Sequence, residues 1–586
     1  MHDKRAGRNP SSFVLSLLGS PLIKIPFIFF LLLVGAILYW NSLQTPFLWD
    51  EHFLILRDPR VYTGSRFFDI FRDPFQSRES GFSTYYRPLI TLSFRIDHMF
   101  WGFNPLGYHL TNLFFHLSNT FLVYALFRHL FKDLTLSFWG AFLFMAHPAH
   151  VEAVTYIPGR VDLIAFFFFL LGFHFYLRGR DLDRKVWSYA LSLLFYLLAL
   201  LSKEMAATLP LVILSHALFV NREERKTLRA EGILIFCSLF LFISWLLLRQ
   251  CVFVRVPLKD LLDLPYLSKR VLALPGVLLA YFKIWFFPWP LSMERRVPVV
   301  ALGILPLLGR WILFLVFVVG IFLSLRKPIE RFWLFWIAGT LLPVLHIVPI
   351  YLARPTSLYI AEHFLYFPST GIIALLLSRF RRFWVSQEVS APSLPQGAVL
   401  LGGLLTCFSF LVIWRNGEYR DKVTFFEQTI RHAPWSSRAH NQLGIAYVDM
   451  GNLEEAEKLF RTSVSLAPNP NPYVNLGLLA GRQGRIEEAI RYHEKGLKLF
   501  PGYSIALFNL GHLHANQHEW RKALEYYEEA IRNNPDADTR IYSEKSYVYW
   551  ELGEKEKALQ TVNEGLKRVS SDPTLQGIKK WIEERL

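Results

Sequence analysis

An acidic pair, Asp50 and Glu51, directly follows the first long hydrophobic stretch of the chain. A carboxylate at a membrane boundary is costly unless it is paired, solvated or used in chemistry. One such use is general base catalysis, in which the carboxylate takes the proton of an acceptor group. We therefore predict Asp50 as the base, with Glu51 positioning it or sharing the proton. The structural alternative is that the pair caps the start of an interfacial helix with favourable charge.

Three cations between later hydrophobic stretches could hold a phosphate group as it leaves: Arg87, Arg160 and Lys203. Guanidinium and ammonium groups match phosphate oxygens, and they stabilise the charge that develops on a leaving phosphate. The alternative for each of them is snorkelling to the membrane surface or pairing with Asp162 or Glu204.

Further polar residues gather in short segments between apolar stretches, and we predict that they line the same cavity. They are His109, His147, His150, Glu152, Asp162, Glu204, Glu362 and Tyr366. The spacing of His147, His150 and Glu152 offers no clear third ligand, so we predict no metal site and no firm cofactor, with a divalent cation as the alternative. Glu362 and Tyr366 lie one helical turn apart, although core packing explains Tyr366 about as well.

Composition points to a membrane protein. Hydrophobic residues make up 53% of the 586 residues and aromatic residues 16%, against 19% charged, which is typical of a chain that lies in a bilayer. The net charge of +16 could suggest nucleic acid, but the Lys and Arg fall between apolar stretches, so anionic lipid headgroups are the predicted partner. The three cysteines are far apart and suggest neither a disulfide framework nor a zinc site.

Twelve apolar stretches are long enough to be considered as membrane spans. They lie near 25 to 40, 108 to 127, 137 to 156, 161 to 177, 187 to 201, 205 to 220, 232 to 248, 270 to 288, 311 to 325, 332 to 350, 359 to 377 and 397 to 414.

Basic clusters set the predicted orientation of these spans. Lys4, Arg5 and Arg8 precede the first one, which we interpret as a retained anchor with a cytoplasmic segment 1–24. Strict alternation conflicts with the later basic loops, and prolines interrupt the pattern between about 249 and 310. We therefore predict one re-entrant or interfacial segment there, leaving eleven crossings. The loop 41–107, with its interfacial helices, and the C-terminus are then extracytoplasmic.

The chain changes to a soluble, amphipathic pattern at about residue 418, after a predicted membrane domain at 25–417. A period of 33 to 34 residues is marked by Pro434, Pro468, Pro501 and Pro535. Small and aromatic positions recur within it, and the pattern resembles the tetratricopeptide repeat. The domain 418–586 is therefore predicted to hold about four repeats, a partial first unit and a capping helix. Its concave face could hold an extended polypeptide acceptor or a partner protein.

Motifs along most of the chain, in order, resemble one enzyme family, the transmembrane and tetratricopeptide repeat-containing O-mannosyltransferases. The motifs are Trp49-Asp50, Tyr86-Arg87-Pro88-Leu89, Gly107-Tyr108-His109-Leu110-Thr111-Asn112, His147-Pro148 with His150 and Glu152-Ala153-Val154, Gly159-Arg160 with Asp162, Lys203-Glu204, and Ala361-Glu362 with Leu365-Tyr366 and Pro368-Ser369.

The resemblance implies an all-α GT-C glycosyltransferase fold, followed here by a repeat solenoid, and a polyprenyl-phosphate sugar as donor. It also implies that the acid after the first span acts near the acceptor, for example protein Ser or Thr. Glu51 stands where a second Asp is expected and the repeats are few. These departures favour a bacterial relative in the cell membrane, with the endoplasmic reticulum membrane as the alternative.

Three classes of function fit the sequence. The first is an inverting, lipid-linked sugar transferase. The second is an oligosaccharide ligase, for which the decisive charged loop is expected late in the membrane domain, whereas here it follows the first span. The third is a non-enzymatic membrane scaffold, which does not account for carboxylates, arginines and histidines gathered on one side of the bilayer.

Overall fold

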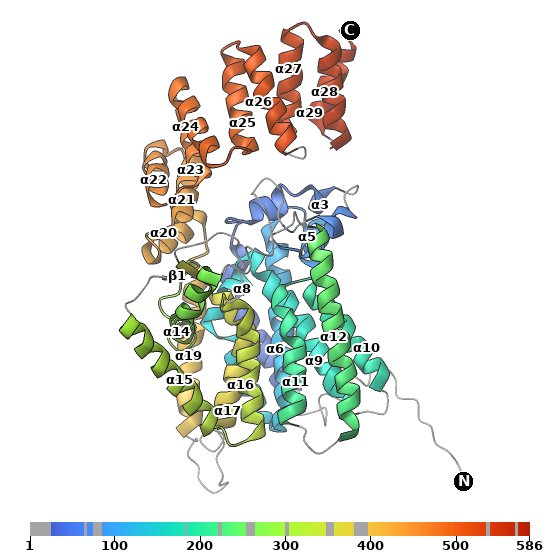
Figure 1. Ribbon diagram of the computed structural model, residues 1–586, viewed down its shortest axis with the longest axis vertical. Coiled ribbons are helices and arrows are strands. Elements are labelled where there is room, and N and C mark those ends of the chain that lie inside the picture. The colour runs from blue at the N-terminus through green and yellow to red at the C-terminus, as the bar shows by residue number, and fades with distance from the viewer. Residues whose placement is uncertain are drawn as a thin grey trace, which may run out of the picture. The chain divides into compact units, whose positions relative to one another are not determined.

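The structure of the protein is a computed structural model with two compact units, one ending at Asp421 and the other running from Lys422 to Leu586. Each unit is described by itself (Figure 1). The structure describes residues 25–63, 67–73, 75, 85–181, 185–220, 225–252, 264–298, 304–346, 357–379, 396–534, 539–568 and 572–586. The predicted cytoplasmic segment 1–24 lies outside these residues.

The first unit is helical, as predicted from its apolar stretches. Its longer helices are α2 (Ile25–Leu38), α5 (Pro88–Trp101), α6 (Pro105–Phe131), α7 (Leu134–Met145), α9 (Arg160–Asp181), α10 (Lys185–Leu200), α11 (Leu209–Phe219), α12 (Arg225–Val252), α14 (Leu264–Phe286), α15 (Ile304–Ser324), α16 (Pro328–Leu341), α17 (Tyr366–Arg379) and α19 (Gln396–Gly417). Helices α6, α9, α11 and α12 run alongside one another, and α11 also packs on α16 (Figure 1).

Four helices in the described part of the chain are long and apolar enough to cross a membrane, judged by length and composition. They are Pro105–Phe131, Ile157–Arg180, Ala230–Gln250 and Val399–Gly417. Shorter apolar helices lie at Ile28–Leu38, Leu134–Met145, Val186–Leu200, Glu204–Phe219 and Leu308–Ser324. These helices are consistent with the predicted membrane location of the chain. The eleven crossings stay a prediction.

The predicted span 137 to 156 is wrong as a single helix. Helix α7 ends at Met145, and the chain continues through three short turns of helix: η5 (Pro148–His150), α8 (Val151–Thr155) and η6 (Ile157–Gly159). Pro148 and Pro158 begin or enter two of these turns, because proline lacks the backbone N–H that a continuing helix would need. The turns carry several of the predicted polar residues, so they belong to the site.

The predicted span 359 to 377 is likewise only partly helical. Its first residues form the strand β2 (Ser357–Ile360), which pairs in antiparallel register with β1 (Arg295–Pro298) so that Arg295 faces Ile360. The turn η9 (Glu362–Leu365) follows, and α17 begins only at Tyr366.

One of the prolines between about 249 and 310 lies inside a helix. Helix α14 runs without interruption from Leu264 to Phe286 with Pro275 inside it. The re-entrant or interfacial segment expected between about 249 and 310 stays a prediction.

The first loop is held on the helices by its own apolar side chains. It contains η1 (Trp40–Gln44), the π-helical turn η2 (His52–Leu56), α3 (Pro59–Tyr62) and α4 (Asp69–Arg72). Leu54 and Ile55 of η2 are buried with Phe94 of α5, Tyr108 of α6 and Ile157. Because this cluster is buried, the segment that carries the acidic pair is fixed on α5 and α6 rather than loose.

The second unit consists of paired helices, as the repeat pattern predicts. The helices are α20 (Lys422–His432), α21 (Ser437–Asp449), α22 (Leu453–Leu466), α23 (Pro470–Arg482), α24 (Ile486–Leu499), α25 (Ser504–Asn516), α26 (Trp520–Asn533), α27 (Arg540–Glu551), α28 (Lys555–Arg568) and α29 (Pro573–Glu583).

Glycines allow the two helices of each pair to pack closely against each other. A Cβ atom on Gly444 or Gly511 would come within 2.5 Å of the ring of Phe460 or Tyr527, respectively, on the following helix. Real Cβ atoms essentially never approach that closely, so the aromatic ring of each second helix needs a glycine in the first.

Candidate functional site

The two carboxylates of the acidic pair have different surroundings. Glu51 is 1% exposed, and its Oε2 accepts a hydrogen bond from the backbone N–H of Trp49 at 2.8 Å. Burial, with a smaller contribution from the Asp50 charge, raises the pKa of Glu51 to about 8. Asp50 is half-buried, and its backbone N–H donates to the Tyr156 hydroxyl at 3.1 Å. Near neutral pH, Glu51 therefore carries a proton, and Asp50 is the member of the pair that a substrate can reach.

Two of the predicted cations pair with two of the predicted acids. Nη2 of Arg87 lies 2.7 Å from Oε1 of Glu204, and Nζ of Lys203 lies 2.6 Å from Oδ1 of Asp162. The Lys203 and Asp162 side chains are almost fully buried, whereas the Glu204 side chain is 31% exposed. The two pairs thus form one cluster, at the start of α5, of α9 and of the turn η7 (Glu204–Thr208), with solvent access at Glu204.

Phe364 connects this cluster to the turn η9. The Lys203 Nζ lies 5.3 Å from the centroid of the Phe364 ring, and the His363 ring lies 4.5 Å from the same ring. Glu152 of α8 holds His363 twice: its Oε1 lies 2.8 Å from Nδ1, and its Oε2 accepts from the backbone N–H at 3.3 Å. Burial raises the pKa of Glu152, but the charge and hydrogen bonds of His363 together with the charge of Arg415 outweigh it, so that the net shift is downward.

Glu362 faces a buried arginine that the sequence analysis did not include in the site. Nη2 of Arg415, near the end of α19, lies 3.5 Å from Oε1 of Glu362. Arg415 also pairs with Glu418, and its guanidinium lies 5.2 Å from the centroid of the Tyr419 ring. Burial raises the pKa of Glu362, against the opposing effect of the Arg415 charge.

Arg160 is enclosed at the start of α9. It is 0% exposed and lies 2.7 Å from Oδ2 of Asp97. Its Nε donates to Oδ1 of Asn112 at 3.0 Å, and its Nη2 donates to the carbonyl of Tyr108 at 2.9 Å. These contacts join α5, α6 and α9, so Arg160 holds the three helices together in this structure.

The predicted histidines bond to the protein itself. His147 accepts from the backbone N–H of Ala149 through Nδ1 at 3.2 Å, so its Nε2 donates to the carbonyl of Trp285 at 3.1 Å. The ring of His150 lies between the carbonyl of Phe144, 2.7 Å from Nδ1, and the Ser369 hydroxyl, 3.0 Å from Nε2.

His109 and Tyr366 are buried in the same manner. His109 Nε2 lies 2.9 Å from the carbonyl of Thr45, which ties the start of α6 to the first loop. The Tyr366 hydroxyl lies 2.8 Å from Nδ1 of His116. Across the described residues, no group of three or more His, Cys, Asp or Glu side chains is arranged to hold a metal ion.

Direct contacts connect most, but not all, of the predicted residues. The path runs from Asp50 to Tyr156, along α8 to Glu152, and through His363 and Phe364 to Lys203 and its neighbours. Other predicted residues are buried and bond to other groups of the first unit: Arg160, His109, His147, His150 and Tyr366.

Sequence reasoning missed Tyr156, His363 and Arg415 as site residues. Tyr156 and His363 stand inside the motifs that carry the other residues, next to charged neighbours. Arg415 follows the last apolar stretch directly, and a lone cation at the end of such a helix is itself a signal of a buried partner.

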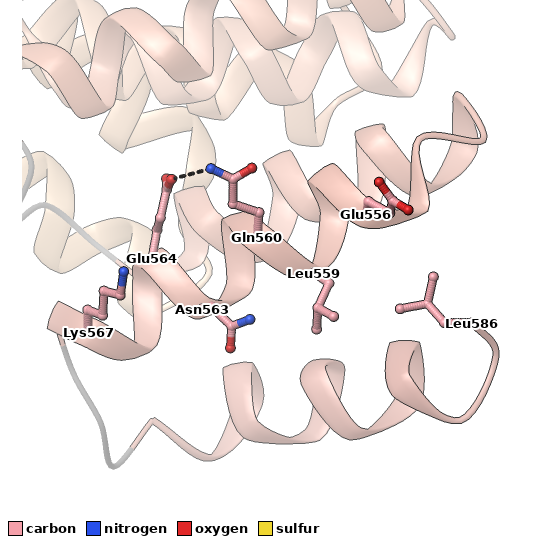
Figure 2. Close-up of a pocket in the computed structure, with 7 residues that line it drawn as sticks. All are labelled: Glu556, Leu559, Gln560, Asn563, Glu564, Lys567 and Leu586. Atoms are coloured by element: carbon pink, nitrogen blue, oxygen red, sulfur yellow. Dashed lines mark hydrogen bonds between the residues drawn. The ribbon is translucent and has the colours of Figure 1, made fainter.

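A pocket on the second unit is lined by none of the predicted site residues. It has a volume of about 400 Å³ and is lined by Glu556, Leu559, Gln560, Asn563, Glu564, Lys567 and Leu586. Figure 2 shows that most of its lining comes from α28, where Gln560 donates to Glu564 at 3.3 Å.

The fold and the buried polar cluster define a membrane protein with a helical repeat domain at its C-terminal end. Family models described as "Tetratricopeptide repeat" match residues 435–502, 470–536 and 508–573. The crystal structure of MamA is similar, with 22% sequence identity, a TM-score of 0.24, and coverage of 26% of this chain and 90% of that chain.

The relatives that match beyond the repeats carry one family name. Protein O-mannosyl-transferase TMTC3 of Homo sapiens is 25% identical over 620 residues, which cover 90% of this chain and 66% of the relative. Protein O-mannosyl-transferase Tmtc1 of Drosophila melanogaster is 37% identical over 179 residues, which cover 30% of this chain and 21% of the relative. The chain thus spans just under two thirds of the length of TMTC3.

These matches confirm the predicted resemblance: the chain is similar, over most of its length, to the transmembrane and tetratricopeptide repeat-containing O-mannosyltransferases.

Proposed function

We propose that the first unit transfers a sugar from a polyprenyl-phosphate donor to a hydroxyl acceptor on the extracytoplasmic side of a membrane. The observation that carries the proposal is the reachable Asp50 beside the buried, protonated Glu51, on a path of contacts that ends at Lys203 and Arg87. The names of the relatives support mannose as the sugar and protein as the acceptor. Placement in a bacterial cell membrane stays a prediction.

In the proposed reaction, Asp50 takes the proton of the acceptor hydroxyl as its oxygen attacks the anomeric carbon of the sugar. The bond between that carbon and the phosphate oxygen breaks, and the electron pair leaves with the polyprenyl phosphate. Glu51 is uncharged near neutral pH, so it does not add a second negative charge where the acceptor oxygen becomes electron-rich. Attack from the face opposite the phosphate inverts the anomeric carbon.

Arg87 and Lys203 are the proposed phosphate ligands. Glu204 engages Nε and Nη2 of Arg87, which among the described residues leaves Nη1 for an anion. Lys203 gives one hydrogen bond to Asp162, and an ammonium group has three donors. Both cations can therefore keep their carboxylate partners while they stabilise the leaving phosphate. Arg160 receives no such role, because its donors are already engaged.

The second unit is proposed to present the acceptor or a partner protein. Stacked helix pairs form an extended surface that suits an extended polypeptide, and the repeat matches support a protein-binding role. The groups proposed for catalysis all lie in the first unit. The proposal therefore assigns recognition to the repeats and chemistry to the membrane unit.

The test is a transfer assay with the purified full chain and a panel of polyprenyl-phosphate sugars. Asp50→Asn keeps the shape of the side chain and removes the basic oxygen, so it should lower turnover by at least about 100-fold, the scale of general base catalysis. Asp421→Asn, the same change at an exposed aspartate, is the matched control and should leave turnover unchanged. Turnover retained in Asp50→Asn would remove this residue from the mechanism, and no transfer from any donor by the wild-type chain would end the proposal.

A further inference from the structure

Tyr156 has the contacts of a residue that serves the acidic pair. Its side chain is buried, and its hydroxyl oxygen accepts from the backbone N–H of Asp50 at 3.1 Å. The same hydroxyl also forms a side-chain hydrogen bond with Asp50, and the charges of Asp50 and Glu51 both act on it. One phenol therefore contacts the main chain and the side chain of the residue proposed as the base.

The backbone that carries Tyr156 is fixed from two sides. Asn112 of α6 donates from its amide to the carbonyls of Val154 and Tyr156, at 3.1 and 3.4 Å. On the other side, Gly159 donates from its N–H to the Tyr156 carbonyl at 2.8 Å. A Cβ on Gly159 would lie 2.7 Å from the carbonyl oxygen of Glu152, so the turn closes more tightly than another residue would allow.

The protonation of Tyr156 suits a hydrogen-bond donor. Burial, then the charges of Asp50 and Glu51, raise its pKa well above the ordinary value. The phenol therefore stays protonated at any pH at which the protein would work. Because its oxygen already accepts the N–H of Asp50, the O–H proton is left to donate to a carboxylate oxygen.

We infer that Tyr156 is a positioning residue for Asp50: it holds one carboxylate oxygen by a hydrogen bond and so leaves the other aimed at the acceptor hydroxyl. This inference rests on the proposed function. A hydrogen bond to the charged carboxylate favours that form, so Tyr156 also keeps Asp50 ready to accept a proton at lower pH. The charged groups that act on its hydroxyl are Asp50 and Glu51 of the first loop.

The experiment measures kcat/KM against pH for the wild-type chain and for Tyr156→Phe, with the donor that the wild type uses. The variant removes only the hydroxyl, so we expect kcat to fall about tenfold and the acidic limb of the profile to move to higher pH by about one unit, since one hydrogen bond to a charged group contributes on the order of 1.5 kcal/mol. The KM for the donor should stay at the wild-type value, which also shows that the variant is folded.

Tyr86→Phe is the matched control. Tyr86 is as deeply buried, but its hydroxyl donates to the carbonyl of Phe71 at 2.9 Å and not to the acidic pair. The acidic limb of the pH profile of Tyr86→Phe should coincide with that of the wild type. A wild-type acidic limb in an active Tyr156→Phe, or an equal displacement in Tyr86→Phe, would overturn the role of Tyr156 and leave the transferase proposal standing. A wild-type chain that transfers nothing would instead overturn the transferase proposal itself.

Discussion

Replacement of Arg160 by methionine should destabilise the protein rather than weaken its use of a donor. The guanidinium is 0% exposed and pairs at 2.7 Å with Asp97, whose residue is 4% exposed. Methionine restores much of the apolar volume but leaves the Asp97 carboxylate buried without its cation. Removing one partner of a buried ion pair costs about 3 to 5 kcal/mol. The contacts of Arg160 with Asn112 and Tyr108 are lost as well, which places the expected loss in the upper part of that range.

The assay is denaturation of the full chain in detergent, followed by tryptophan fluorescence, together with donor KM for the fraction that remains folded. A double variant, Arg160→Met with Asp97→Leu, is the informative control, because it removes both charges. Replacing both members of a buried pair with apolar groups is often neutral, so the double variant should recover most of the lost stability. An Asp97→Leu single variant completes the cycle and should be as unstable as Arg160→Met.

Two patterns of results would refute this reasoning. If Arg160→Met kept wild-type stability while the donor KM rose, Arg160 would bind the donor, and its enclosure between α5, α6 and α9 would be incidental. If the double variant were less stable than either single variant, the pair would contribute more than its desolvation costs.

Two further predictions concern the acidic pair and the repeats. Burial raises the pKa of Glu51 to about 8, so the folded state holds a proton that the unfolded state releases near pH 4.5. The free energy of unfolding should therefore fall as pH rises from about 5 through 8, by up to about 1.4 kcal/mol per pH unit. In denaturation measured as a function of pH, Glu51→Gln should remove this part of the dependence of stability on pH. An unchanged dependence in the variant would contradict the prediction. In the repeats, Gly511→Ala should cost about 1 to 3 kcal/mol through its clash with Tyr527, seen as faster amide exchange in α25 and α26 of the full chain. Gly496→Ala, with its nearest neighbour at 3.6 Å, is the control and should leave exchange unchanged.

The repeats could be predicted from the sequence almost completely, because their interactions are local. Gly511 and Tyr527 are 16 positions apart and belong to one helix pair. A repeating unit that packs only on its neighbours leaves its spacing visible in the sequence. For the same reason the apolar stretches predicted helices well. The end of α7 at Met145 and the start of α17 at Tyr366 were missed, because apolar composition continues through the turns that follow α7 and precede α17.

The partners of the charged residues could not be predicted in the same way. Arg87 and Glu204 are 117 positions apart, and Glu152 and His363 are 211 apart. Charge type marks each residue as expensive to bury, but it does not say which opposite charge the fold brings to it.

By itself, the sequence determined that the chain is an α-helical membrane protein with tetratricopeptide repeats, and it singled out the residue types able to do chemistry at the boundary. These properties follow from composition and period, which are features of neighbouring residues. Only the tertiary structure decided that Glu51 is buried and Asp50 reachable, that Arg160 is enclosed, and that Tyr156 reaches the acidic pair from 106 positions away. Burial and pairing arise where distant segments meet, and they set the protonation and orientation of each group.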